Sequence, residues 1–222
     1  LVIAKLNLKM INNIDKPALS GLWPNKKGMS VVLDLGANIE CNDKNLMDFS
    51  MMGASLLKAL FPDETPKVAL LNIGSEAIKG NEIIKNTYQK LSQMNNLNYE
   101  FKGFIEGNNL MNGDVNVIVT DGFTGNVALK TAEGTANFIT KNLKNSLNKV
   151  SILMSFYSLR KFKEKLDPRK YNGAIFLGLE SPVVKSHGGT DSIGFAHSIK
   201  VCNKIVNANL IAKIKSNLIT VD

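Results

Sequence analysis

The feature that most constrains the fold is residues 115–133, where a strand pattern changes abruptly into a helix pattern. The stretch opens with a β-branched run typical of a buried strand, passes through a polar turn with glycines, and resumes with apolar residues at helical spacing. In open α/β proteins, ligands bind outside the carboxyl ends of such strands, near helix N-termini with free N–H groups. We therefore predict that the turn at 121–126 forms half of an anion-binding site.

Two earlier segments repeat this unit of a strand followed by a polar turn and a helix. Residues 30–35 lead into a turn that contains Asn38, and residues 67–73 lead into a turn before Lys79 and a helix that runs to about Gln93. Shorter strands are expected near 99–104 and 173–179. Strands that alternate with helices predict an α/β fold, with a three-layer, mostly parallel sheet and helices on both faces.

The remaining segments complete a single α/β domain over residues 1–222. Apolar spacing before residue 15 is typical of the end of a helix, residues 16–24 of an irregular connection, and residues 193–214 of one last helix. Helical pattern also runs from Thr131 nearly to Leu166, which is long for one globular helix, so a break is expected at 150–151. Residues 133–170 are thus predicted to form a basic, protruding helical pair.

Most of the net charge of +8 belongs to that extension. Nine basic and two acidic residues lie between Lys141 and Lys170, which leaves +7 in this segment alone. Such a patch suits an acidic partner, whether nucleic acid, an anionic membrane surface or an acidic carrier protein. No nucleic-acid partner is expected, because neither a recognition motif nor an aromatic platform is present in the sequence.

The sequence also argues against several other classes of protein. No apolar run reaches the length of a membrane span, and the first residues have neither a signal peptide nor an initiator Met, so upstream residues are expected to be missing. Two distant cysteines, Cys41 and Cys202, fit a reducing cytoplasm. With only His187 and His197 and no paired spacing, neither a metal nor another cofactor is expected.

Four segments together resemble a known family. LDLGAN, LLNIGSEAIKGNE, DGFTGNVALKTAEG and GAIFLGLESPVVKSHGGTD are similar, in this order, to motifs of the bacterial phosphate acyltransferases called PlsX. The resemblance covers about residues 16–199 and implies a fold like that of isopropylmalate dehydrogenase and phosphotransacetylase. It also implies a homodimer and a further N-terminal region with its own glycine-rich turns, so the 222 residues are expected to be a truncated form.

The activity that the resemblance implies is transfer of an acyl group from acyl-acyl-carrier protein to inorganic phosphate, giving acyl-phosphate for phospholipid synthesis. Phosphate is itself nucleophilic, so the site needs donors for the dianion and for the tetrahedral oxyanion. By the resemblance, Lys79 and Asn126 act at the reaction centre, and His187 is a candidate acid for the leaving thiolate. Each has a simpler alternative: a surface lysine, a helix N-cap, and a structural hydrogen-bonding histidine.

Substrate-binding candidates surround these residues in the turns. Turn formation is the alternative for Asn38 and Asp121, stabilisation of a helix N-terminus is the alternative for Glu82, and Cys41 is expected to be inert packing. The full set of candidates is Asn38, Gly80, Asn81, Glu82, Asp121, Gly122, Thr124 and Gly125.

The basic stretch at 151–170 combines an apolar stripe with a cationic face. It is interpreted as a dimer or core helix, as a contact with anionic membrane, or as a dock for acyl-carrier protein. The residues expected to make a membrane or carrier contact are Phe156, Arg160, Lys161, Phe162 and Lys163. The expected localisation is cytoplasmic, and the membrane contact would add a peripheral association with the membrane.

Two rival functions stay open at this point. One is a phosphotransacetylase-like enzyme that uses acyl-CoA, and the other is a membrane-binding scaffold that keeps the fold without turnover. A nicotinamide-dependent dehydrogenase of related fold is disfavoured, because no GxGxxG motif follows a strand.

Overall fold

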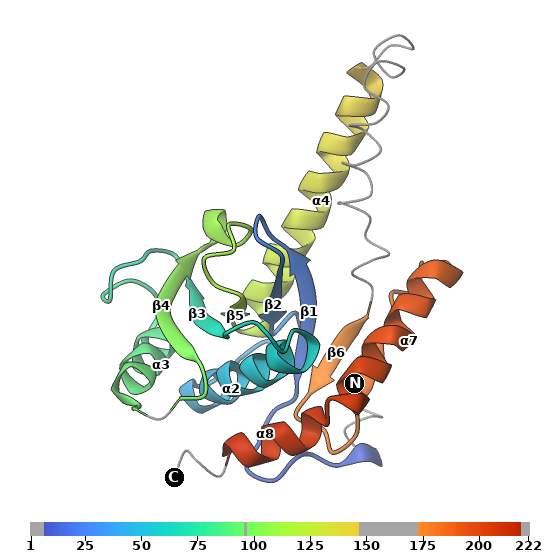
Figure 1. The fold of residues 1–222 in the computed structure, drawn as a ribbon. Coiled ribbons are helices and arrows are strands. Elements are labelled where there is room, and N and C mark those ends of the chain that lie inside the picture. Colours follow the sequence, from blue (N-terminus) through green and yellow to red (C-terminus); the bar gives the residue numbers. More distant parts are fainter. Residues whose placement is uncertain (1–6, 96, 147–172, 219–222) are drawn as a thin grey trace.

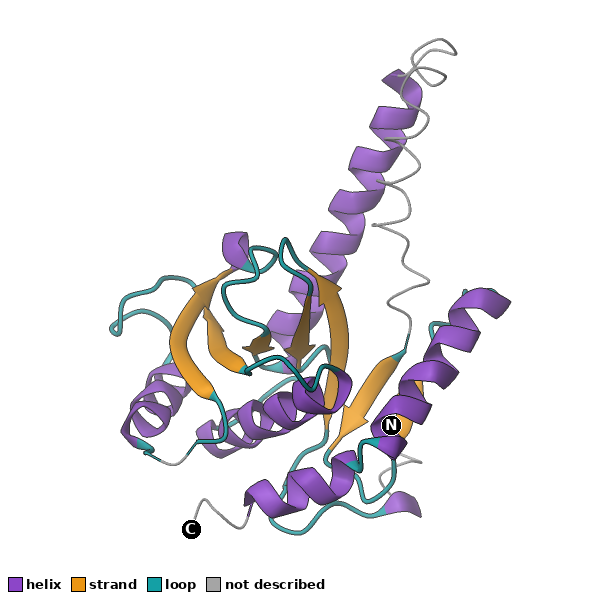
Figure 2. Cartoon of the chain, in the orientation of Figure 1, coloured by secondary structure: helices purple, strands orange, loops and turns teal. Residues whose placement is uncertain are grey.

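The computed structural model describes residues 7–95, 97–146 and 173–218. They form an α/β fold around one seven-stranded sheet of order β4-β3-β5-β2-β1-β6-β7 (Figure 1, Figure 2). The strands are β1 (Ala18–Pro24), β2 (Met29–Leu33), β3 (Lys67–Asn72), β4 (Glu100–Glu106), β5 (Val117–Val119), β6 (Ala174–Leu177) and β7 (Val183–Lys185).

The sheet is mixed but mostly parallel, as predicted. The four strands β4, β3, β5 and β2 pair in parallel. Strand β1 is antiparallel to both β2 and β6, so β6 runs in the same direction as β2, while β7 is antiparallel to β6. Five strands therefore point one way, and their carboxyl ends meet at one edge of the sheet.

Helices cover both faces, which confirms the layered architecture. Helices α2, α3, α7 and α8 pack on one face, and α4 packs on the other through its first turns, where Ala128, Leu129 and Ala132 meet the sheet. The bounds are α2 (Asp43–Leu60), α3 (Glu82–Gln93), the 3-10 turn η1 (Gly107–Asn109), α4 (Gly122–Ser146), α7 (Ser192–Asn207) and α8 (Leu210–Leu218).

The central helix α2 fixes the core. Its N-terminus is closed by a reciprocal capping box between Asn42 and Asn45, and most of its residues are buried. Gly53 lies where the helix comes closest to the sheet, because a Cβ there would stand 2.7 Å from Val117 Cγ1 and 2.9 Å from Leu33 Cδ2. The absent side chain lets helix and strands approach.

Three sequence predictions about the periphery are wrong. Residues 18–24, expected to be irregular, form β1, because the tight turn at 25–28 folds them back onto β2. The last helix is two helices, since Asn209 adopts φ 50° between α7 and α8. The helix end expected before residue 15 lies at residue 8, so the helical pattern assigned up to Ile14 is wrong in extent, and Met10 forms an isolated bridge to Leu179.

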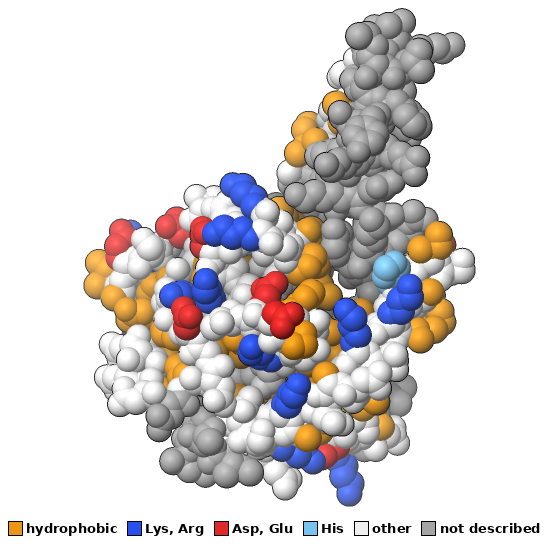
Figure 3. Space-filling model, in the orientation of Figure 1, with side chains coloured by type: hydrophobic (Ala, Val, Ile, Leu, Met, Phe, Trp, Pro, Cys, Tyr) orange, Lys and Arg blue, Asp and Glu red, His pale blue; other side chains and the backbone are white. Residues whose placement is uncertain are grey.

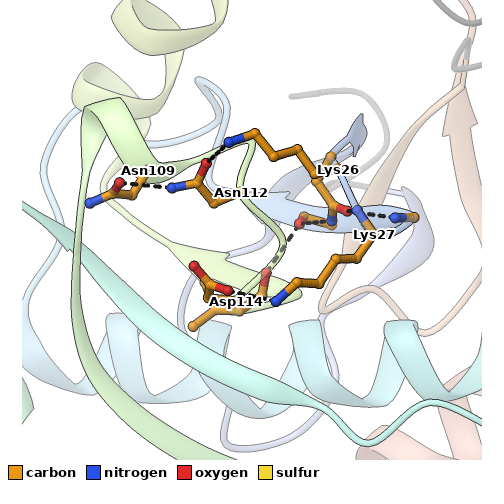
Figure 4. A network of polar contacts seen from close by, with 9 residues as sticks. Lys26, Lys27, Asn109, Asn112 and Asp114 are labelled. Atoms are coloured by element: carbon orange, nitrogen blue, oxygen red, sulfur yellow. Dashed lines mark hydrogen bonds and ion pairs between the residues drawn. The ribbon is translucent and has the colours of Figure 1, made fainter.

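The β1–β2 hairpin is tied to the loop that precedes β5. Lys26 Nζ donates to Asn112 Oδ1 at 2.7 Å, and Lys27 pairs with Asp114 at 2.6 Å (Figure 4). Asn112 in turn donates to Asn109 Oδ1 at 2.8 Å. Both lysines therefore link the hairpin to the loop before β5. These contacts lie at the amino edge of the parallel strands, opposite the edge where those strands end.

Helix α4 projects well beyond the sheet (Figure 1). Its 25 residues span about 37 Å. Apolar side chains are visible at the surface of the projecting part (Figure 3), and Phe138 and Ile139 of α4 are 70% and 51% exposed. The predicted break at 150–151 and the second member of the helical pair lie outside the described residues. Within the described parts of the chain, no helix has the length and apolarity needed to cross a membrane.

We predict opposite effects of alanine at two helical glycines. Gly53→Ala should lower the free energy of unfolding by about 1–2 kcal/mol, because overpacking of the buried contact outweighs the gain of about 1 kcal/mol in helix propensity. Gly134 lies exposed on α4 with nothing within 4 Å of its Cβ position, so Gly134→Ala should raise stability by about 0.5–1 kcal/mol. Urea denaturation measures both, and a stabilising Gly53→Ala would contradict the packing described.

Candidate active site at the carboxyl edge of the sheet

Three turns meet at the carboxyl edge because their strands are neighbours. Strand β5 lies between β3 and β2, and all three are parallel. The turn at 34–38 follows β2, the loop at 73–81 follows β3, and a short connection at 120–121 follows β5. The predicted turn at 121–126 is therefore wrong in extent, because α4 already begins at Gly122. The structure thus places Asn38, Lys79 and Asn126 at one edge, in the segments that follow three adjacent strands.

The turn after β2 is built around Asp34, a residue that the sequence reasoning missed. Its side chain is fully buried, and its carboxylate accepts five hydrogen bonds. Oδ1 accepts from the backbone N–H groups of Leu19, Gly36 and Ala37 at 2.9–3.1 Å. Oδ2 accepts from Asn38 N at 2.8 Å and Asn38 Nδ2 at 2.7 Å. These bonds join the start of β1 to the whole turn.

Burial dominates the electrostatics of this carboxyl group. Desolvation raises the pKa of Asp34 above its ordinary value, while the bonds donated by Ala37, Leu19 and Asn38 offset part of the rise. The signal that could have revealed it is a carboxylate directly after the apolar run Val31–Leu33 and two residues before Gly36, which is an arrangement that favours a turn.

The first turn of α4 packs directly on the 34–38 turn, and two glycines allow the contact. A Cβ at Gly125 would lie 1.9 Å from the carbonyl oxygen of Asp34, and a Cβ at Gly122 would lie 2.3 Å from that of Asn38. In place of a side chain, Gly122 N donates to Asn38 O at 2.8 Å. No other residue fits at either position without moving the backbone, so the two turns form one junction.

Asn126 belongs to this junction. Its Nδ2 donates to Leu35 O at 3.2 Å, and Gly36, at φ 121°, leaves room for it, since a Cβ there would lie 2.7 Å from Nδ2. The alternative that Asn126 caps a helix is wrong, because α4 begins four residues earlier, at Gly122. An amide nitrogen carries two hydrogens, so one N–H remains beyond the bond to Leu35.

Asp121 acts as the cap of α4. Its carboxylate accepts from Thr124 N and from Thr124 Oγ1, both at 2.8 Å, and its carbonyl accepts from Gly125 N at 2.9 Å. The structure therefore shows the turn-forming alternative for Asp121. Several of the donors predicted to cradle an anion are used within the junction, including both N–H bonds of the Asn38 amide, which go to Asp34 and Pro17.

The loop after β3 is more open. Asn72, a buried residue at the end of β3, donates to Lys79 O at 3.1 Å and accepts from Ile73 N at 2.9 Å, so it holds both ends of the loop. Gly80 adopts φ 94° against the Asn72 side chain. Lys79 is exposed, and among the described residues no hydrogen bond or ion pair engages its ammonium group.

The residues that follow Lys79 organise α3. Asn81 is the N-cap, with Oδ1 accepting from Ile84 N at 2.9 Å. Lys79 therefore precedes the helix, and the prediction that Lys79 stands at the start of the helix is wrong. Glu82 occupies that first turn and pairs with Lys85 at 3.0 Å. Helix stabilisation accounts for Glu82, and substrate contact by Asn81 or Glu82 stays a prediction.

His187 lies elsewhere. Strand β7 ends at Lys185 opposite Ala174, the first residue of β6, so the loop with His187 leaves from the amino edge of the parallel strands. There His187 Nδ1 accepts from Gly189 N at 3.2 Å. The structure does not bring His187 together with Lys79 and Asn126 within one chain. The five membrane or carrier contacts predicted between 156 and 163 lie outside the described residues.

Cys41 lies under the junction and is buried. Desolvation and the nearby Asp34 charge raise the pKa of its thiol to about 11, so the thiolate is disfavoured near neutrality. Cys41 and Cys202 are both free thiols. The raised pKa agrees with the prediction that Cys41 is inert.

Chemically, this edge offers a cation on the open loop after β3 and, in the segment after the neighbouring strand β5, an amide donor held by its bond to Leu35 O. A lysine ammonium attracts an anion such as phosphate, and a fixed N–H stabilises negative charge that develops on a carbonyl oxygen. Neither group is a nucleophile here, so the arrangement suits a reaction in which a bound anion supplies the attacking atom.

Comparison with known proteins places the chain in a family. The family model described as fatty acid synthesis protein matches residues 1–213. A phosphate acyltransferase of Pelagibacter ubique is 72% identical over 98% of this chain and 67% of its own length. One from Paramagnetospirillum magneticum is 45% identical over 93% of this chain and 60% of its own length. The chain thus spans about two thirds of these relatives.

Solved structures support the same fold at lower similarity. The EutD phosphotransacetylase from Staphylococcus aureus superposes with a TM-score of 0.61 at 16% identity, over 93% of this chain and 58% of that one. A phosphotransacetylase from Streptococcus pyogenes gives 0.57 at 15%, over 92% and 57%. At this identity the likeness concerns the fold alone. From the family match and the close relatives, the chain belongs to the fatty acid synthesis protein family, the PlsX phosphate acyltransferases that its motifs resemble.

Proposed function

We propose that the protein containing this chain transfers an acyl group from acyl-acyl-carrier protein to inorganic phosphate. The observation that supports the proposal is the position of Lys79 and Asn126 after neighbouring parallel strands, at the same sheet edge, in a chain 72% identical to a phosphate acyltransferase. The product is an acyl-phosphate, and its use is phospholipid synthesis.

The reaction follows from the two groups. Phosphate binds beside the Lys79 ammonium, and one of its oxygens attacks the thioester carbonyl. A C–O bond forms, and the oxyanion accepts a hydrogen bond from the remaining Asn126 N–H. The tetrahedral intermediate then collapses, the C–S bond breaks, and the electron pair leaves with sulfur as a thiolate. A thiolate leaves readily, so protonation from solvent suffices, and a role for His187 as the acid stays a prediction.

The direct test is acyl-phosphate formation from ³²P-labelled phosphate. Acyl-acyl-carrier protein should yield labelled acyl-phosphate at a higher kcat/KM than the matching acyl-CoA. Higher efficiency with acyl-CoA would favour the phosphotransacetylase-like alternative, which the fold of the structural neighbours keeps open. Absence of product with both substrates, together with binding to vesicles, would favour the scaffold.

Replacement of Lys79 tests the anion site. Lys79→Ala should lower kcat/KM for phosphate roughly 10²-fold with little change in stability, because the side chain is exposed and holds no other residue in place. The matched control is Lys102→Ala, which removes an exposed lysine of β4 that pairs with Glu100. If the two variants kept similar activity, Lys79 would have no part in the reaction.

We also propose a cytoplasmic homodimer that associates with anionic membrane or with the carrier through its basic segment. Exposed Phe138 and Ile139 on α4 support a protein or lipid contact there.

Replacing Arg160, Lys161 and Lys163 by Glu should abolish flotation with anionic vesicles and binding of carrier protein. Retention of both would exclude that role, and a monomer in sedimentation velocity at micromolar concentration would exclude the dimer.

A further inference from the structure

One peptide unit connects Asp34 to Asn126. The N–H of Gly36 and the C=O of Leu35 belong to the same planar peptide, so they point in opposite directions. That N–H donates to Asp34 Oδ1 at 3.1 Å, and that C=O accepts from Asn126 Nδ2 at 3.2 Å. The orientation of this peptide therefore decides where the Asn126 amide points.

The peptide has little freedom to rotate. On one side, Leu35 N donates to Leu19 O at 2.8 Å, and on the other, Ala37 N donates to Asp34 Oδ1 at 2.9 Å. Both flanking positions are thus held, and Asp34 is the common acceptor for the two amides after Leu35. Gly36 itself is exposed and at φ 121°, so no packing around it fixes the orientation of the peptide. The hydrogen bonds to the buried Asp34 carboxylate fix it instead.

We propose that Asp34 is a positioning residue for the acyl transfer, fixing the Leu35–Gly36 peptide so that the Asn126 amide is aimed at the developing oxyanion. The inference rests on the proposed function and deepens it. Asp34 touches no substrate: it acts through the peptide and through Asn126. A displaced donor stabilises the oxyanion poorly, so Asp34 governs the chemical step more than phosphate binding, for which Lys79 supplies the charge.

The first experiment compares Asp34→Asn with a control carboxylate. Asparagine keeps the shape but has one accepting oxygen in place of two. Its NH₂ group therefore faces either the three donors on Oδ1 or the two donors on Oδ2, and the network that holds the Leu35–Gly36 peptide is loosened. The expected result is a fall of about 10²-fold in kcat, with KM for phosphate changed less than about threefold. Asp48→Asn removes a largely buried carboxylate of α2, paired with Lys44, and should leave kcat unchanged.

The decisive readout is a double-mutant cycle with Asn126→Ala. If Asp34 acts through Asn126, adding Asp34→Asn to Asn126→Ala should lower kcat by less than about twofold, because the donor is already absent. A general structural defect would lower kcat equally in both backgrounds. Additive losses, or an unchanged kcat in Asp34→Asn, would therefore overturn the inference while leaving the proposed function intact.

A second variant covers the case in which Asp34→Asn does not fold. Gly36→Ala keeps the Asp34 carboxylate but puts a Cβ against Asn126 Nδ2, so it displaces the same amide from an exposed position. Its loss of kcat should likewise vanish in the Asn126→Ala background, and an equal loss there would overturn the inference. A wild-type protein that forms no acyl-phosphate would refute the proposed function, and this inference with it.

Discussion

The arrangement of the site depends on the hydrogen bonds that the buried Asp34 carboxylate accepts. An unpaired charge in a protein interior is strongly unfavourable, and here five N–H donors satisfy it. The same bonds give hydrogen-bond acceptors to backbone N–H groups that, in an exposed turn, would otherwise donate to water. Since Gly122 and Gly125 let α4 settle on this turn, the restraint passes from β2 into the helix that carries Asn126.

The two halves of the site are built differently. Asn126 lies in a junction whose backbone groups are bonded to one another, whereas Lys79 lies on an open loop that Asn72 holds only near its ends. A fixed donor suits charge that develops at one point in a transition state, and an exposed cation suits capture of a small anion. This division agrees with the acyl transfer that we propose.

Sequence reasoning predicted the central units because strand and helix periodicities change sharply there, as in residues 115–133. It missed β1, whose pattern is broken by Gly21 and bounded by prolines, and which becomes a strand only by pairing with β2. It could not place His187, since the reversal at β7 is set by pairing and not by spacing. Asp34 was overlooked because burial of a carboxylate depends on glycines far away in the sequence.

Amide hydrogen exchange tests the central claim about Asp34 most directly. The amide protons of Gly36, Ala37 and Asn38 should exchange at least about 10²-fold slower than in an unstructured peptide, although the turn lies at the surface. In Asp34→Asn the protection should disappear for the amides that lose their acceptor, either Gly36 and Ala37 on Oδ1 or Asn38 on Oδ2. The amide of Val31, bonded to Asn116 O, should stay protected. Exchange of the three turn amides at the unprotected rate in the wild-type protein would contradict the account.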